Sequence, residues 1–529
     1  MIRKAFFFVV IFLCSAAIAQ ITISKDSILA RDSIVRLNEL KFDNLKEKDY
    51  YLKYLKSKEI NDAVHLLFYG KYENSNVDSI IRKIDEHVGI LRSKMDKLSE
   101  KKKMKFLYTY IHNNFFDKYV ELALFPDIFT NKEYNCLSAS ILYGYFLEKL
   151  RIPYEARLSN THVYLVAYPK TLNIILETTN PVSQIGKITD DTKRQYVNQM
   201  RSLKLIGSDE FEKLTVDELF SKYYYKEEAV NMYEMVGAHY LNRAAGYLFK
   251  FSYSEGYNLI LKGHVINPSY KTIFSILQTG VAILQQDVFK KPEDAEILGI
   301  LSRFNNYGIT NDMIIADFNN LSKTQLIEAK DTTLYINSYN KIINVINDSA
   351  LKSNISEIYY DAMCRHYYKI SKIGKSLEFA EKMFILNPNR DENEDILIEV
   401  LTNYIDQSDE VFNDKDVFDK IQTYVKYKPS IEKKTSFFGL FIVSYWINLA
   451  DKEYSKGKMD EGDKYLEEFE KIITPEQAEK LYRLIQDVYV SGSFHYYKKY
   501  NNKKAKEYIE RGLKILPDNY ELNRRLKAL

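Results

Sequence analysis

The chain has 529 residues, with 75 Lys and Arg against 72 Asp and Glu, and a formal charge of +3. Because single hydrophobic cores stop growing at roughly 250 to 300 residues, we expect two or three domains. Charges of both signs are interspersed along the chain, which excludes the basic patch that a nucleic-acid partner requires.

The N-terminus predicts export. Arg3 and Lys4 precede an apolar run from Ala5 to Leu13, and small residues follow before Gln20. This pattern is typical of a secretory signal peptide covering residues 1–19. No later apolar stretch reaches the roughly 20 residues of a membrane span, so we expect an exported protein, periplasmic or secreted, without a membrane span.

The next part of the chain has a helical pattern. We expect an N-terminal helical region over residues 20–97 and a further helix around residues 105–116, with apolar residues at helical spacing. A buried helix is predicted from Leu137 to Leu150, beginning at or near Cys136. Pro153 ends this helix, because proline cannot continue the hydrogen-bond ladder.

Two β-branched and aromatic-rich runs follow, at 161–168 and 172–178, and predict an antiparallel hairpin that turns at Pro169 and Lys170. With the turn centred there, the numbers of paired residues sum to 339, which sets His162 opposite Glu177, about 5 Å apart at Cβ. A register slip of one residue would send the two side chains to opposite faces. The glutamate needs such a partner, since an unpaired charge in an apolar strand is costly.

Cys136 and Cys364 are the cysteines that remain after signal removal. Export would allow them to form a disulfide, and Cys136 could also be a small buried apolar residue. The third alternative is a nucleophile. A helix N-terminus lowers the pKa of a thiol and offers a backbone N–H to an oxyanion, while a histidine held by a carboxylate can move the proton.

In this order, the segments resemble the transglutaminase-like superfamily over about residues 98–185. The resemblance rests on the helix at 105–116, Asn135-Cys136, Ile152-Pro153 with Arg157, Thr161-His162-Val163-Tyr164-Leu165 and Glu177-Thr178-Thr179-Asn180-Pro181. It implies a papain-like α+β core with Cys136 as nucleophile, His162 as general base and acid, and Glu177 as the orienting acid.

The chain departs from that family in two ways. Aspartate is frequent in relatives where Glu177 stands, and a Trp or Gly near the nucleophile is replaced here by Tyr134, Leu137 and Ser138. The side chain that would bind the oxyanion is unassigned. Asn114 and Asn135 are the candidates, and each could instead be a turn or cap residue.

From residue 242 onward the pattern is helical and repetitive. A small or apolar residue is followed by apolar residues at +4, +7 and +10 and by proline at +12. Copies begin at Gly256, Ser376, Val417 and Ala505 and end at Pro268, Pro388, Pro429 and Pro517. The spacing indicates helix-pair repeats of about forty residues, which resemble tetratricopeptide repeats.

The sequence thus predicts a mostly α protein: an α+β transglutaminase-like core followed by a tetratricopeptide-like α-solenoid. The expected regions are a signal peptide (1–19), a helical region (20–97), the core domain (98–185), a helical linker (186–241) and repeats (242–529). We expect no cofactor and no metal site; Cys364 and His366 lie two residues apart on a helix and so face different directions.

The predicted function is that of an exported thiol enzyme. Through a thioester on Cys136 it would hydrolyse amide bonds of protein or peptide substrates or transfer their acyl groups, with a protein partner held by the repeats. Two alternatives stay open: an inactive transglutaminase-like fold that serves as a protein-binding scaffold, and a purely structural secreted repeat protein.

Overall fold

The computed structural model of the chain describes residues 34–158, 162–179, 190–202, 206–224, 228–285, 289, 291–406 and 414–529. The predicted signal peptide lies outside these residues. The described part is mostly helical, as expected. It forms two compact units: one runs to Asp317 and includes Thr332–Asn347, and the other comprises Phe318–Asp331 and Asp348–Leu529. The division falls within the predicted repeat region, and the boundaries of the five predicted regions stay predictions.

The first unit begins with the short 3-10 helix η2 (Leu37–Glu39) and four helices in the region where the sequence predicted them. They are α3 (Leu45–Ser57), α4 (Ile60–Tyr69), α5 (Val77–Met95) and α6 (Glu100–Phe115). Side chains of Asn44 and Asn76 cap α3 and α5 by accepting backbone N–H groups, which explains where these helices start.

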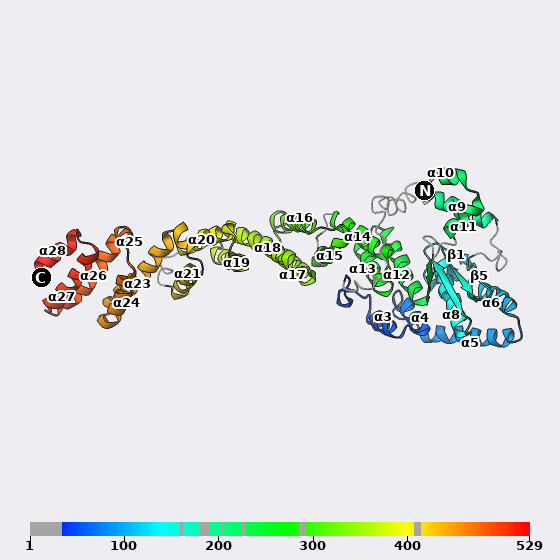
Figure 1. Ribbon diagram of the computed structural model, residues 1–529. Coiled ribbons are helices and arrows are strands. Elements are labelled where there is room, and N and C mark those ends of the chain that lie inside the picture. Colours follow the sequence, from blue (N-terminus) through cyan, green and yellow to red (C-terminus); the bar gives the residue numbers. More distant parts are fainter. Residues whose placement is uncertain are drawn as a thin grey trace. The chain divides into compact units, whose positions relative to one another are not determined.

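A four-stranded antiparallel sheet follows, in the order β5-β4-β3-β6. Its strands are β3 (Tyr154–Leu158), β4 (Val163–Ala167), β5 (Ile174–Leu176) and β6 (Glu228–Val230). Helix α8 (Cys136–Lys149) contacts β4 and β3, and Figure 1 shows the cyan strands of the sheet close to it. On β4, Tyr164 and Val166 pack instead against α9 (Asp190–Ser202) and α11 (Val216–Tyr224); α10 (Ser208–Lys213) lies between these two in the chain. All of β4 is therefore buried.

The predicted hairpin is present, but its predicted register was wrong by two residues. Leu165 pairs with Leu176 and Ala167 with Ile174, so paired numbers sum to 341 and not 339. The connection is longer than the assumed turn because Tyr168 and Asn173, both with positive φ, extend it to six residues. A shift of two residues preserves the face of every side chain.

A second, parallel pair of short strands precedes α8. Strand β1 (Lys118–Tyr119) pairs with β2 (Glu133–Tyr134), and the short helix α7 (Asp127–Thr130) lies between them in the chain. In the pairing, Tyr119 lies beside Tyr134. Since β2 leads directly into α8, the segment around Tyr119 runs alongside the residues that introduce the helix.

The helices of the first unit continue with α12 (Met232–Leu248), α13 (Tyr253–Ile266), α14 (Tyr270–Gln285), α15 (Pro292–Leu301), η3 (Asn305–Tyr307), α16 (Asn311–Ser322) and α17 (Thr332–Val345). Helix α16 runs from the first unit into the second, where the short π-helix η4 (Lys323–Glu328) follows it. Within the first unit, α12 packs on α13 and α15 on α17.

A buried charge pair anchors α3 to this helical layer. Glu47 of α3 and Lys262 of α13 are both fully buried, and the Lys262 Nζ lies 2.9 and 3.0 Å from the two Glu47 carboxylate oxygens. The same carboxylate accepts hydrogen bonds from the Tyr240 hydroxyl and the Asp43 N–H, and Arg243 lies 3.7 Å away. Both carboxylate oxygens of Glu47, which are buried away from water, thus accept hydrogen bonds from protein groups.

The second unit contains the remaining helices. They are α18 (Ser349–Lys369), α19 (Ile373–Leu386), α20 (Asp391–Asp406), α21 (Lys415–Tyr427), α22 (Ser430–Lys434), α23 (Phe437–Ser455), α24 (Met459–Ile472), α25 (Pro475–Lys480), α26 (Tyr482–Lys498), α27 (Asn502–Ile515) and α28 (Tyr520–Ala528). Helix α23 packs on both α24 and α26, and α26 packs in turn on α27; Figure 1 shows these helices towards the C-terminal end of the chain.

The predicted repeat frame matches real helix ends in both units. Each frame proline stands two residues after the last helical residue, as Pro268 does after α13 and Pro517 after α27. Each time, the N–H at +11 donates to the carbonyl at +7: Asn267 to Gly263, Asn387 to Met383, Lys428 to Tyr424 and Leu516 to Gly512. One frame position departs from the pattern: Tyr427 is 67% exposed, so the stripe of α21 ends one turn early.

A second signature of the repeat escaped the sequence reading. The turns joining α12 to α13, α18 to α19, α23 to α24 and α26 to α27 all have a residue with positive φ: Phe251, Ser371, Gly457 and Tyr500. After each, the next N–H bonds back five residues, which closes the same Schellman turn four times. Helix α24 is itself a further copy of the frame, beginning at Gly462, that the sequence reading missed because its proline, Pro475, stands at +13.

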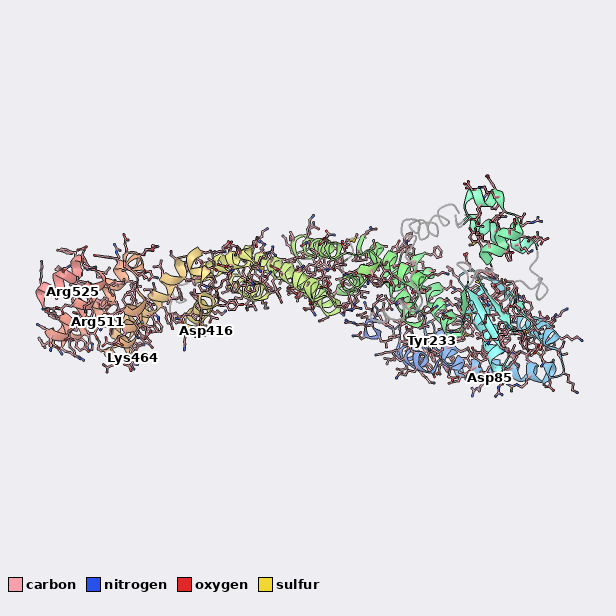
Figure 2. The ribbon with its side chains drawn as sticks, viewed as in Figure 1. Asp85, Tyr233, Asp416, Lys464, Arg511 and Arg525 are labelled. Atoms are coloured by element: carbon pink, nitrogen blue, oxygen red, sulfur yellow. The ribbon has the colours of Figure 1, made fainter. Side chains whose placement is uncertain are left out.

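Tyrosine rings fit against glycines where these last helices cross. A Cβ on Gly462 would lie 2.4 Å from the Tyr454 ring, and one on Gly492 would lie 2.5 Å from the Tyr508 ring. The hydroxyls of both tyrosines donate to Asp463. A third tyrosine, Tyr489, donates its hydroxyl hydrogen to Glu470. The same carboxylate pairs with Arg511 of α27, which is labelled in Figure 2. Tyr454, Tyr489 and Tyr508 thus bury their rings while their hydroxyls donate hydrogen bonds to carboxylates.

Candidate active site

The predicted nucleophile stands at the first residue of α8, as the sequence indicated. Asn135 caps the helix: its side chain accepts the Ser138 N–H at 2.8 Å, and the Ser138 hydroxyl in return accepts the Asn135 N–H at 2.9 Å. Among the described residues, the N–H groups of Cys136 and Leu137 have no hydrogen-bond partner. Two backbone donors and the positive end of the helix therefore lie at the thiol.

His162 and Glu177 are in direct contact. The Nε2 atom of His162 lies 2.9 and 2.8 Å from the two carboxylate oxygens of Glu177. His162 immediately precedes β4 and Glu177 immediately follows β5, so neither belongs to the paired part of the sheet. In the observed register they are diagonal neighbours and not direct partners, and they meet because a two-residue shift keeps both on one face.

The histidine also joins the cysteine. Hydrogen bonding to the Cys136 side chain and its negative charge are among the causes that raise the pKa of His162, which places the sulfur near the ring. Cys136 and Cys364 are both free, which excludes the disulfide alternative in this structure. Cys364 is buried in the second unit, where its sulfur lies 3.3 Å from the Ser376 hydroxyl.

The electrostatics of the site favour a charged imidazole. Burial by itself lowers the pKa of His162, whose side chain is only 18% exposed. The negative charge of Glu177 and hydrogen bonds to Cys136 and Glu177 act in the opposite direction and raise this pKa well above its ordinary value. The raised pKa thus favours the imidazolium form of His162, which is the form that results when the ring accepts a proton from a neighbouring thiol.

Two buried hydroxyls connect the three segments of the site, and the sequence reading missed them. Ser140 of α8 lies 3.1 Å from the Thr178 hydroxyl and donates to the carbonyl of Val163, next to His162. Thr178, next to Glu177, donates to the Cys136 carbonyl. The available signal was a pair of serines within an otherwise apolar helix, since a buried hydroxyl requires a partner.

The carboxylate has further support. Thr179 donates from its hydroxyl to a Glu177 oxygen at 2.9 Å, and Tyr108 of α6 donates to the Glu177 main-chain carbonyl at 2.7 Å. Helix α6 is thereby attached to the strand end that holds the acid. On the far side of α8, the Tyr145 hydroxyl donates to Asp85 of α5 at 2.9 Å (Asp85 is labelled in Figure 2).

The two predicted oxyanion side chains are used elsewhere. The Asn135 amide nitrogen donates to the Glu121 carbonyl while its oxygen caps α8, so this residue is a helix cap. Asn114 is exposed near the end of α6, where its amide nitrogen donates to the Tyr110 carbonyl one turn back. Both contacts argue against the oxyanion assignment, because each amide nitrogen already donates to a backbone carbonyl.

Within the described ranges, no group of three or more His, Cys, Asp or Glu side chains is arranged to hold a metal ion. In the same ranges, no helix has both the length and the apolar character that crossing a membrane requires.

No family model matches this chain, and no curated protein matches it. Among solved structures, one similar chain belongs to "Structure of Naa15/Naa10 bound to HypK-THB", with 11% sequence identity. The match covers 64% of this chain and 62% of that chain, less than two thirds of its length, with a TM-score of 0.13. A likeness this weak carries no argument, so the function has to be argued from the residues and their geometry.

Proposed function

We propose that the chain is an exported thiol enzyme with a transglutaminase-like, papain-like core, acting on amide bonds of protein or peptide substrates. Cys136 is the nucleophile, His162 the general base and acid, and Glu177 the residue that orients the imidazole. One observation carries the proposal: Cys136, at the start of a helix, lies close enough to His162 to raise the pKa of the ring, and the ring's Nε2 lies 2.8 Å from the Glu177 carboxylate.

The reaction follows from these positions. The sulfur attacks the amide carbonyl carbon, a C–S bond forms, and the C–N bond breaks as His162 gives its proton to the leaving amine. A water or an acceptor amine then attacks the thioester and loses a proton to His162, and the thiolate leaves. Hydrolysis and acyl transfer differ only in this second nucleophile.

Export and a protein partner belong to the same proposal. Residues 1–19 have the order of a secretory signal peptide, which supports a periplasmic or secreted location. Stacked helix pairs expose extended surfaces, which supports a role for the repeats in holding a protein partner or substrate.

Thiol labelling tests the proposal. The mature protein is treated with iodoacetamide at mildly acidic pH, and the two cysteines are followed separately by peptide mass spectrometry. Cys136 should react far faster than the buried Cys364, and His162→Ala should remove most of that difference. His366→Ala is the matched control, because it removes a histidine two residues from Cys364 and should change neither rate.

The alternative is an inactive fold that serves as a scaffold. Equal, slow labelling of both cysteines in the folded protein would favour it and remove the thiol mechanism. If labelling is selective, Cys136→Ala should abolish any hydrolytic or acyl-transfer activity while leaving the circular dichroism spectrum unchanged.

A further inference from the structure

Attack of a thiolate on an amide places a negative charge on the carbonyl oxygen, and hydrogen-bond donors must meet that charge. The first turn of α8 offers backbone N–H groups at Cys136 and Leu137. Neither Asn114 nor Asn135 supplies a side-chain donor, because their amide nitrogens already donate to backbone carbonyls.

Strand β1 brings another candidate to this place. Tyr119 pairs with Tyr134, and their rings meet edge to face with centroids 5.9 Å apart. Asn135 is extended, with φ −132° and ψ −177°, so Tyr134 and Cys136 project to the same side of the chain. Tyr119 therefore stands on the side from which the sulfur emerges. Val120 fixes this register by donating its N–H to the Tyr134 carbonyl.

The surroundings of the Tyr119 hydroxyl agree with this placement. Burial is the largest cause that raises the pKa of Tyr119, and the negative charges of Cys136, Glu121 and Glu177 raise it further. The residue as a whole is nevertheless 51% exposed, so part of it reaches solvent, and the influence of the Cys136 and Glu177 charges on its pKa points the hydroxyl towards the site. The phenol consequently stays protonated at neutral pH and keeps its donor hydrogen.

We propose that the Tyr119 hydroxyl is the side-chain donor to the oxyanion, acting together with the backbone N–H at the start of α8. The inference rests on the proposed thiol mechanism and adds a catalytic residue to it. In the tetrahedral intermediate the hydroxyl donates to the new alkoxide, and no proton leaves Tyr119. Its contribution exists only where a carbonyl is attacked.

That condition gives a direct test with two reagents. Acylation of Cys136 by p-nitrophenyl acetate passes through an oxyanion: the C–S bond forms and p-nitrophenolate leaves. Alkylation by iodoacetamide displaces iodide and forms no oxyanion. Tyr119→Phe should lower the acylation rate of Cys136 about 100-fold, the size of effect known for one oxyanion donor, and change its alkylation rate less than twofold. Mass spectrometry assigns both products to Cys136.

Tyr134→Phe is the matched control, because it removes a hydroxyl from the neighbouring ring. It should change neither rate more than about twofold, since the donor is assigned to Tyr119 alone. Unchanged acylation in Tyr119→Phe would overturn the inference, and so would an equal fall in both rates, which would mean an effect on the thiolate. If the unaltered protein fails to alkylate Cys136 faster than Cys364, the thiol mechanism itself fails, and the inference falls with it.

Discussion

The buried pair of Glu47 and Lys262 makes a quantitative prediction about the stability of the first unit. Lys262→Met removes the ammonium and keeps most of the side-chain volume. It leaves a carboxylate that is fully buried and has lost contacts of 2.9 and 3.0 Å. Breaking a buried pair in this way costs about 3–5 kcal/mol. Arg243, 3.7 Å from the same carboxylate, compensates in part, so we expect a loss of about 3 kcal/mol.

A double-mutant cycle tests the reasoning behind that figure. In Glu47→Leu with Lys262→Met neither charge remains, and the groups left without an acceptor are the Tyr240 hydroxyl and the Asp43 N–H. The double variant should therefore cost about 2 kcal/mol less than the sum of the single changes.

The assay is hydrogen exchange in increasing urea, read from peptides of α3 and α13, because the two units can unfold separately. Lys118→Met, in the same unit, is the control: the Lys118 side chain of the pair with Glu133 is exposed, and the pair should contribute less than about 0.5 kcal/mol. The reasoning is refuted if Lys262→Met costs no more than the control, or if the two single changes are additive.

Three further predictions concern the site, its pH dependence and the repeats. Glu177→Gln removes the charge that raises the pKa of the imidazole, so labelling of the active cysteine should fall more at pH 8 than at pH 5.5; a parallel fall would contradict this. Burial lowers the pKa of His264 to about 4. The unfolded chain then binds the extra proton, so stability is complete above pH 6.5 and about 2 kcal/mol is lost by pH 5; urea unfolding of His264→Gln should show a flatter pH profile. Gly492→Ala forces a Cβ against the Tyr508 ring and should destabilise the second unit by about 1–3 kcal/mol, whereas Gly374→Ala meets only an ordinary contact and should not.

Local chemistry explains which features could be predicted. Asn135 and Ser138 supply the capping pattern that begins a helix, so the position of Cys136 followed from short-range signals. A glutamate beside an apolar strand required a partner, and the alternation of a strand restricted the choice of face. The contact with His162 was thus predictable, although the register was not, because Tyr168 and Asn173 adopt positive φ without the glycine that usually signals it.

Long-range pairing explains what was missed. Strand β6 has three residues and pairs with β3, about seventy positions earlier in the chain. The residues of so short a strand do not indicate which distant strand it pairs with. The same holds for Tyr119, whose place beside Tyr134 depends on a two-residue strand. The asparagines chosen for the oxyanion had suitable chemistry, but the amide nitrogen of Asn114 donates one turn back to Tyr110 and that of Asn135 donates to Glu121, fourteen residues earlier. Only the folded chain shows which donors are already in use.

The capped helix end of the repeats has a consequence for how such a chain can diverge. The complete copies of the repeat, in α13, α19 and α27, share a small residue where helices cross, a carbonyl that accepts the cap N–H, a preceding turn with positive φ and a proline after the helix. Most other residues can be replaced as long as buried positions stay apolar and exposed positions stay polar. Sequence identity between related chains can therefore fall to a low level while the helical arrangement is kept. Relatives of such a chain are better recognised by the spacing of their helix ends.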